Sequence, residues 1–213
     1  MQAARAEVAA LCQRLVSEKL VVGTAGNVSI RVGDKVAISP SGFDYLSLTG
    51  DEVAVVDLAG NQIEGDYKPS SEVMLHLAIY NTSDHQSIVH THAVSSTALS
   101  LVVDQVPLSH YYSALFGGAI RVAPYATYGS ADLAAGVQLA MKNRYGALMS
   151  NHGAVVASSS GAKAFELAQY LEYVCEIHLK AMATGSPIKL LNSADLDLVL
   201  KEISTYGQSK PKQ

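Results

Sequence analysis

The sequence is poor in charge and in cysteine, and it has no long hydrophobic run. Charged residues make up 16% of the 213 residues and hydrophobic residues 49%. The net charge of −4 comes without a basic stripe that could displace counterions, so we expect no nucleic-acid partner. No apolar run reaches the ~18 residues of a membrane span. The N-terminal stretch carries Glu7 and Arg14 and is therefore no signal peptide, so we expect no membrane partner.

The two cysteines, Cys12 and Cys175, each lie in a helical pattern among apolar neighbours. This pattern predicts two buried free thiols rather than a disulfide framework, and hence a protein of the reducing cytoplasm. The length suits one domain over residues 1–213, with a flexible C-terminal tail from about 207. A surface with so little charge also suggests burial between subunits.

Hydrophobic periodicity predicts helices and strands that do not alternate strictly. Helices are expected over 4–20, 70–80, 93–101, 130–143, 161–183 and 194–204. Strands are expected over 28–32, 35–39, 53–58, 86–92, 119–125, 146–151 and 153–158. Several strands follow one another as hairpins. The predicted fold class is therefore α/β, with one mixed, mainly antiparallel sheet covered by helices on both faces.

Two histidines, His90 and His92, close an apolar strand in the stretch "SIVHTHAVSS". Side chains two residues apart on a strand point to the same face, so these imidazoles project together. Imidazole suits zinc, and a catalytic zinc site commonly has three protein ligands and an open position. His152, in the tight connection of "MSNHGAVV", is the best candidate for the third ligand. The spacing alone leaves a structural role for the pair open.

Glu72 begins the helix of "KPSSEVM" and has three possible roles: a helix cap, a fourth metal ligand or a general base. His76 lies four residues later on the same helix face. It is a further candidate ligand, although a packed or surface histidine is the more common case.

Three short segments are rich in glycine, serine and asparagine: "TAGNVSIR", "SPSGFDY" and "KPSSE". Each alone is ordinary turn chemistry. Together they offer backbone amides, hydroxyls and a helix N-terminus, which suit a phosphate group. No lysine-bearing P-loop is present, so a small phosphorylated metabolite is a better ligand than a nucleoside triphosphate.

Seven motifs in order resemble the class II sugar-phosphate aldolase/epimerase family: "GTAGNVSIR", "SPSG", "KPSSE", "VHTHA", "SHYYSALFGG", "APYATYGS" and "SNHGAVV". The resemblance covers nearly the whole chain and is strongest to the bacterial L-fuculose-1-phosphate aldolases. It implies a three-layer α/β/α sandwich and a cyclic homotetramer whose active sites lie between subunits. It also implies reversible, Zn²⁺-dependent cleavage of a ketose 1-phosphate to dihydroxyacetone phosphate and a small aldehyde, other divalent transition metals being possible.

The resemblance also implies roles for particular residues. His90, His92 and His152 match the zinc-binding histidines, and Glu72 matches the carboxylate that ligates the metal and acts as acid/base. Tyr111 matches a tyrosine that a neighbouring subunit contributes, with Tyr112 as the alternative. The phosphate- and substrate-binding set corresponds to Gly26, Asn27, Ser41, Gly42, Ser70, Ser71, Tyr128 and the C-terminal Tyr206.

Two positions depart from the pattern of the fuculose-phosphate enzymes. Tyr128 stands where they carry phenylalanine, and Asn151 where they carry histidine, so the aldehyde preference stays open. A sugar-phosphate 4-epimerase, a 5-deoxypentulose-phosphate aldolase and a methylthioribulose-phosphate dehydratase are alternatives within the family. Epimerases carry aspartate at the position of Glu72, which favours the aldolase. A non-catalytic module like the adducin head domain is the alternative outside enzymes.

Overall fold

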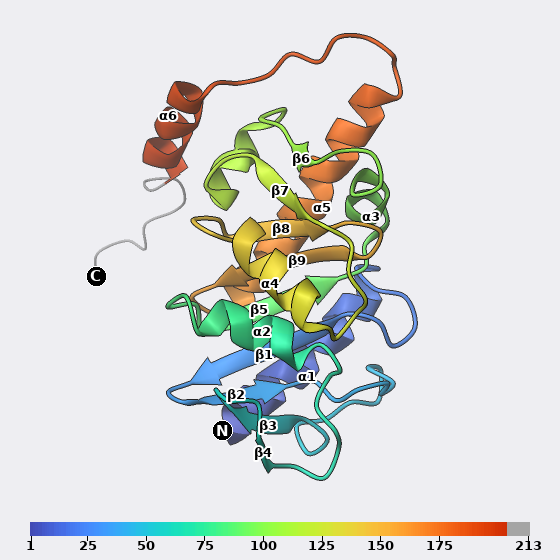
Figure 1. The fold of residues 1–213 in the computed structure, drawn as a ribbon, viewed down its shortest axis with the longest axis vertical. Helices are drawn as coiled ribbons and strands as arrows, with labels where there is room; N and C mark the ends of the chain where they lie inside the picture. Colours follow the sequence, from blue (N-terminus) through green and yellow to red (C-terminus); the bar gives the residue numbers. More distant parts are fainter. Residues whose placement is uncertain (204–213) are drawn as a thin grey trace, which may run out of the picture.

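Nine strands form one sheet within residues 1–203, the part of the chain that the computed structural model describes (Figure 1). The strand order is β4-β3-β2-β1-β5-β9-β8-β7-β6. The strands are β1 (Asn27–Val32), β2 (Lys35–Ile38), β3 (Ala54–Asp57), β4 (Gln62–Glu64), β5 (Ser87–Thr91), β6 (Gln105–Val106), β7 (Ile120–Ala123), β8 (Gly146–Met149) and β9 (Gly153–Ser158). All neighbouring pairs of this sheet are antiparallel except β7 and β8. The expected mixed, mainly antiparallel sheet is confirmed.

Helices cover both faces of the sheet, as the α/β/α sandwich requires. Helices α2 (Val73–Tyr80) and α4 (Ala131–Ala140) pack on one face. Helices α1 (Gln2–Ser17), α3 (Val94–Leu99) and α5 (Gly161–Met182) lie on the other face. A 3-10 helix, η1 (Tyr111–Phe116), and the last helix, α6 (Ser193–Ile203), contact each other beside the β6 edge.

Successive strand residues supply two separate hydrophobic cores, because neighbouring side chains point to opposite faces. In β5, Ile88 packs with α2 and α4, while Val89 packs with α1 and α5. In β9, Val155 and Val156 divide in the same way. The central strands are therefore apolar on both faces, which explains why their sequences are nearly continuous hydrophobic runs.

Some elements differ from the sequence prediction. Helix α1 ends at Ser17 rather than at 20, because Lys19 adopts a left-handed backbone with φ of 59°. Strands β4 and β6 and the 3-10 helix η1 were not expected. Cys12 and Cys175 are buried free thiols, as expected. No helix within residues 1–203 is long and apolar enough to cross a membrane.

Gly153 allows the turn between β8 and β9 to press against the end of β5. A Cβ atom at this position would lie 2.2 Å from the carbonyl oxygen of Thr91 and 3.4 Å from Cα of His92. A Cβ atom cannot lie 2.2 Å from an oxygen atom, and this oxygen belongs to the backbone, so it cannot move aside as a flexible side chain could. The glycine therefore sets the close approach of the two segments that carry His92 and His152.

We predict that Gly153→Ala lowers the free energy of unfolding by about 3 kcal/mol, because the added methyl must displace β9 from β5. Chemical denaturation measures this loss. Gly136→Ala in α4 is the matched control, since its Cβ would meet only ordinary contacts at 3.7 Å or more. The free energy of unfolding of this control should rise by about 0.5–1 kcal/mol, because alanine is more stable than glycine inside a helix. Equal stability of the two variants would contradict the steric argument.

Candidate metal centre and substrate pocket

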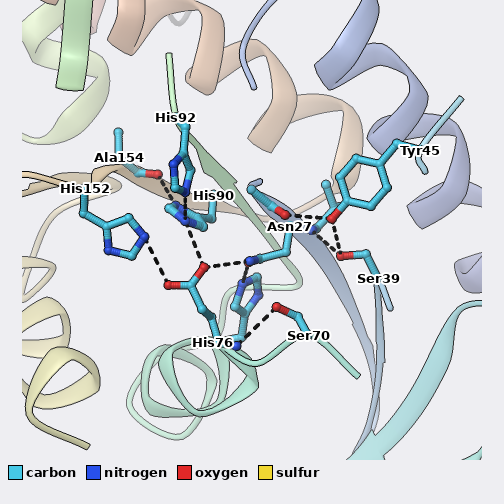
Figure 2. A network of polar contacts seen from close by, with 12 residues as sticks. Asn27, Ser39, Tyr45, Ser70, His76, His90, His92, His152 and Ala154 are labelled. Atoms are coloured by element: carbon cyan, nitrogen blue, oxygen red, sulfur yellow. Dashed lines mark hydrogen bonds and ion pairs between the residues drawn. The ribbon is translucent and has the colours of Figure 1, made fainter. Parts of the chain in front are cut away.

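Four side chains from three segments converge at one end of the sheet. His90 is in β5 and His92 follows that strand, whereas His152 lies in the turn before β9. Glu72 is the residue before the first turn of α2. One ligand atom from each of the four lies within 4.8 Å of the others, in an arrangement that can hold a metal ion. Figure 2 shows the three imidazoles turned toward one another.

The distances within this cluster suit a shared cation. Nε2 of His90 lies 3.0 Å from Oε2 of Glu72, and Nε2 of His152 lies 3.3 Å from Oε1. The Nε2 atoms of His90 and His92 are 2.9 Å apart. Donor atoms around one tetrahedral zinc lie about 3.3 Å from one another, given a bond length near 2.05 Å. Glu72 Oε1 is buried and makes no hydrogen bond to any described residue. A buried oxygen without such a partner is what a carboxylate that ligates a metal would leave when the ion is absent.

The charges of the cluster balance without the metal through an ion pair. Burial alone would raise the pKa of Glu72, but the charge and hydrogen bond of His90, with help from His152 and Asn27, hold it well below its usual range. Burial and the neighbouring His90 and His152 lower the pKa of His92 to about 3. Burial also lowers the pKa of His152. Burial alone would lower the pKa of His90, but the carboxylate of Glu72 and a backbone carbonyl raise it. The site thus pairs a carboxylate with His90 and leaves His92 and His152 as weaker bases, and a bound cation would take over the place of a proton on His90.

The sheet fixes the orientation of the His90 ring. Its Nδ1–H donates to the carbonyl of Ala154 at 2.8 Å, since Ala154 lies on the adjacent strand β9. A histidine held through Nδ1 presents Nε2 to a metal, and such a second hydrogen bond is common at metal sites.

The cluster lies beside a pocket of about 320 Å³. Residues of the cluster and of the predicted phosphate- and substrate-binding set line it together. From the cluster come Glu72, His92 and His152, and from the predicted set Gly26, Asn27, Ser41, Gly42, Ser70, Ser71 and Tyr128. Hydrogen bonds and one strand bridge tie the three glycine- and serine-rich segments together. Pro40 pairs with Pro69 in the bridge, and the hydroxyl of Tyr45 donates to the carbonyl of Gly26 at 2.7 Å. The structure thus brings together three segments that are far apart in sequence.

The predicted catalytic tyrosine, Tyr111, does not line this pocket of the single chain. Tyr111 lies on η1, is 44% exposed, and lines another pocket with Tyr112. Tyr206 lies outside the described residues.

The structure narrows the roles that the sequence left open for Glu72 and His76. Glu72 occupies the N-cap position of α2 but makes no side-chain cap bond, and its carboxylate turns to the histidines instead. His76 is fully buried, and its two ring nitrogens contact Ser29 and Asn27. The spacing of four residues from Glu72 was the one signal for it, and a buried structural histidine has the same spacing.

Comparison with known proteins defines the class. Residues 6–179 match the model of the family described as Class II Aldolase and Adducin N-terminal domain, and the chain belongs to this family. It is 37% identical to an L-fuculose phosphate aldolase of Escherichia coli over 198 residues, and this aligned stretch covers 92% of each chain. It is 34% identical to a 5-deoxy-D-ribulose 1-phosphate aldolase of Bacillus thuringiensis, over 98% of this chain and 99% of that one. A solved L-fuculose 1-phosphate aldolase superposes with a TM-score of 0.90 at 33% identity, over 94% of this chain and 96% of that one.

We predict that His92→Ala abolishes stoichiometric zinc binding while the protein stays folded, because the cluster would lose one of the three imidazole donors that could hold the ion. Metal analysis after gel filtration and a circular dichroism spectrum measure the two properties. His85→Ala is the control, since this histidine precedes β5 and lies outside the cluster. Full zinc content in His92→Ala would exclude His92 as a ligand.

Proposed function

We propose that this chain is a divalent-metal-dependent lyase that reversibly cleaves a ketose 1-phosphate to dihydroxyacetone phosphate and a small aldehyde. One observation carries the proposal. The cluster of three histidines and one carboxylate borders a pocket whose rim is built from serines and glycines, so a metal and a phosphate can bind the two ends of one small molecule. Family membership supports the same reaction type.

His90, His92, His152 and Glu72 are proposed to hold the metal. Three imidazoles and one carboxylate suit zinc best, although other divalent transition metals accept the same donors. When bound, the cation supplies Lewis-acid stabilisation of negative charge that develops on substrate oxygens as the carbon–carbon bond breaks.

The remaining steps are proposed for residues of this chain. The phosphate binds among Gly26, Asn27, Ser41, Gly42, Ser70 and Ser71, and its binding energy orients the reacting carbons. Glu72 borders this pocket with one oxygen free of hydrogen bonds. It is proposed to leave the metal site when the substrate binds, to take up a proton there, and to deliver that proton to C3 after the aldehyde departs. Tyr128 lines the pocket and is proposed to contact the aldehyde part.

Tyr111 is proposed to take the C4 hydroxyl proton, although it lies outside the pocket of its own chain. The proposal therefore requires a neighbouring copy, as in the homotetramer with shared sites that the resemblance implies. Its exposed position on η1 leaves the ring available to such a neighbour. The tetramer, the role of Tyr206 and the cytoplasmic location all stay predictions.

Two substrates have support. One similar protein is an aldolase for L-fuculose phosphate and another for 5-deoxy-D-ribulose 1-phosphate, with nearly equal identities. The second protein matches over a larger share of both chains. Tyr128 replaces the phenylalanine of the fuculose-phosphate enzymes, which supports testing both aldehydes.

We predict that the zinc-loaded protein releases dihydroxyacetone phosphate from at least one of these two ketose phosphates, and that a chelator stops the release. A coupled assay that reduces dihydroxyacetone phosphate with NADH follows the reaction. The unphosphorylated ketose is the control for the phosphate site and should react far more slowly. If metal is bound but neither compound is cleaved, the aldolase proposal fails, and epimerase and dehydratase assays follow. If neither metal nor activity is found, the protein is a binding module.

We predict that Glu72→Gln retains zinc but lowers kcat by about 10²–10⁴-fold, because an amide cannot shuttle the proton. Metal analysis and steady-state kinetics measure both properties. Glu64→Gln makes the same chemical change on strand β4, in a side chain that pairs with Lys35 near the surface, and should keep the wild-type rate. A wild-type rate in Glu72→Gln would exclude the acid/base role.

A further inference from the structure

Helix α2 and strand β1 present two matching polar stripes to each other in the interior. Glu72, His76 and Tyr80 recur every four residues along the helix, and Asn27 and Ser29 lie two apart on the strand. Four helical residues advance about 6 Å, and two strand residues about 6.7 Å. The two stripes therefore stay in step. All five residues are at most 5% exposed.

The stripes interleave into one continuous series of contacts. Glu72 Oε2 lies 2.9 Å from Nδ2 of Asn27. Asn27 Oδ1 lies 2.5 Å from Nε2 of His76. Nδ1 of His76 lies 2.6 Å from Oγ of Ser29, which in turn lies 2.8 Å from the hydroxyl of Tyr80. Figure 2 shows His76 directly beside Asn27, on the side away from the metal-binding histidines.

The carboxylate at the end of this series fixes the direction of every bond. Ionised Glu72 only accepts hydrogen bonds, so Asn27 must turn its NH₂ group toward it. The Asn27 carbonyl oxygen then faces His76, and Nε2 of His76 must carry the hydrogen and donate it. Complete burial lowers the pKa of His76 to about 3, so the ring is neutral and its Nδ1 accepts from the Ser29 hydroxyl. The Tyr80 hydroxyl then donates to Ser29, whose side-chain oxygen lies 2.8 Å and whose backbone carbonyl oxygen lies 3.1 Å away.

We propose that His76 is a positioning residue for catalysis: the Nε2–H tautomer of its ring locks the Asn27 amide with the NH₂ group toward the Glu72 carboxylate. In the opposite tautomer, Nε2 would accept from Asn27, and the amide would turn its oxygen toward a carboxylate oxygen 2.9 Å away. That arrangement is repulsive and would displace Glu72 from the metal and the pocket. His76 thus acts on Glu72 through Asn27, without touching the substrate. This inference rests on the proposed acid/base role of Glu72.

Two substitutions of His76 distinguish the hydrogen bond made by Nε2 from the one made by Nδ1. In His76→Gln, the side-chain NH₂ group takes the place of Nε2–H and can still donate to Asn27. In His76→Asn, the shorter amide replaces Nδ1 and can accept from Ser29, but the bond to Asn27 is lost. Both remove the imidazole and both leave a polar group in the same buried space. Ile79→Val is the control for stability, since it removes one buried methyl from α2 and lies outside the polar series.

We expect His76→Asn to lower kcat and the affinity for Co²⁺ by about 10–100-fold each, with KM changed less than threefold. His76→Gln should recover most of both losses. Ile79→Val should keep the kcat and the cobalt affinity of the wild type, even if its melting temperature is as low as that of the His76 variants or lower. The proposal is overturned if His76→Asn keeps wild-type kcat and cobalt affinity. It is also overturned if the asparagine and glutamine variants lose both properties equally, because a merely structural histidine predicts this.

A measurement on the unmutated protein makes the test independent of folding defects and of substrate. Nitrogen-15 NMR of the zinc-loaded, histidine-labelled protein should show His76 as a neutral ring with hydrogen on Nε2 throughout pH 6–8. Hydrogen on Nδ1, or a doubly protonated ring, sinks the proposal. If the wild type cleaves no ketose phosphate, the proposed function fails, while the tautomer and the cobalt affinities still decide the role of His76.

Discussion

A carboxylate buried among imidazoles is the constraint on which the rest of the structure depends. Glu72 is 5% exposed, and an ionised carboxylate out of water is costly unless charge and hydrogen bonds compensate. His90, His152 and Asn27 supply that compensation, and each comes from a different part of the sheet. The strand order β1-β5-β9 brings exactly these parts side by side. The site is therefore a property of the sheet topology, and a loop transplanted without its neighbours would not reproduce it.

The two faces of the sheet contribute differently to this arrangement. The face under α1 and α5 has a large apolar core. The face under α2 also has an apolar core, but a polar row runs beside it along β1. Partly satisfied polar rows are destabilising, whereas a fully paired row specifies one arrangement of helix on strand. The position of α2 is thus set by directional bonds as well as by hydrophobic contact.

Local pattern predicted much of the sheet and offered His90, His92 and His152 as candidate ligands, which the structure brings into one cluster. The two-residue spacing of His90 and His92 on an apolar strand was enough to place their rings on one face. His152 was the best candidate for a third ligand because it lies in a tight connection between two apolar strands, and the resemblance, not its spacing, assigned it the role. Strand β6 has two residues and β4 three, so neither is long enough to show a periodicity, and η1 has no helical repeat to detect. The partners of His76 were unpredictable for another reason: Asn27 lies opposite His90 through a register that joins distant strands, and no local signal encodes it.

The distances along the chain between the site's components have a kinetic consequence. His90 and the carbonyl that holds its ring are 64 residues apart, and Glu72 and Asn27 are 45 apart. The strand pairings β1–β5 and β5–β9 join equally remote segments, so the four side chains come together only when these strands have paired. The nascent or partly folded chain therefore has no preformed cage for the ion. Uptake of a metal ion by this cluster would therefore report that the sheet around it has formed, and a bound ion would stabilise the folded molecule.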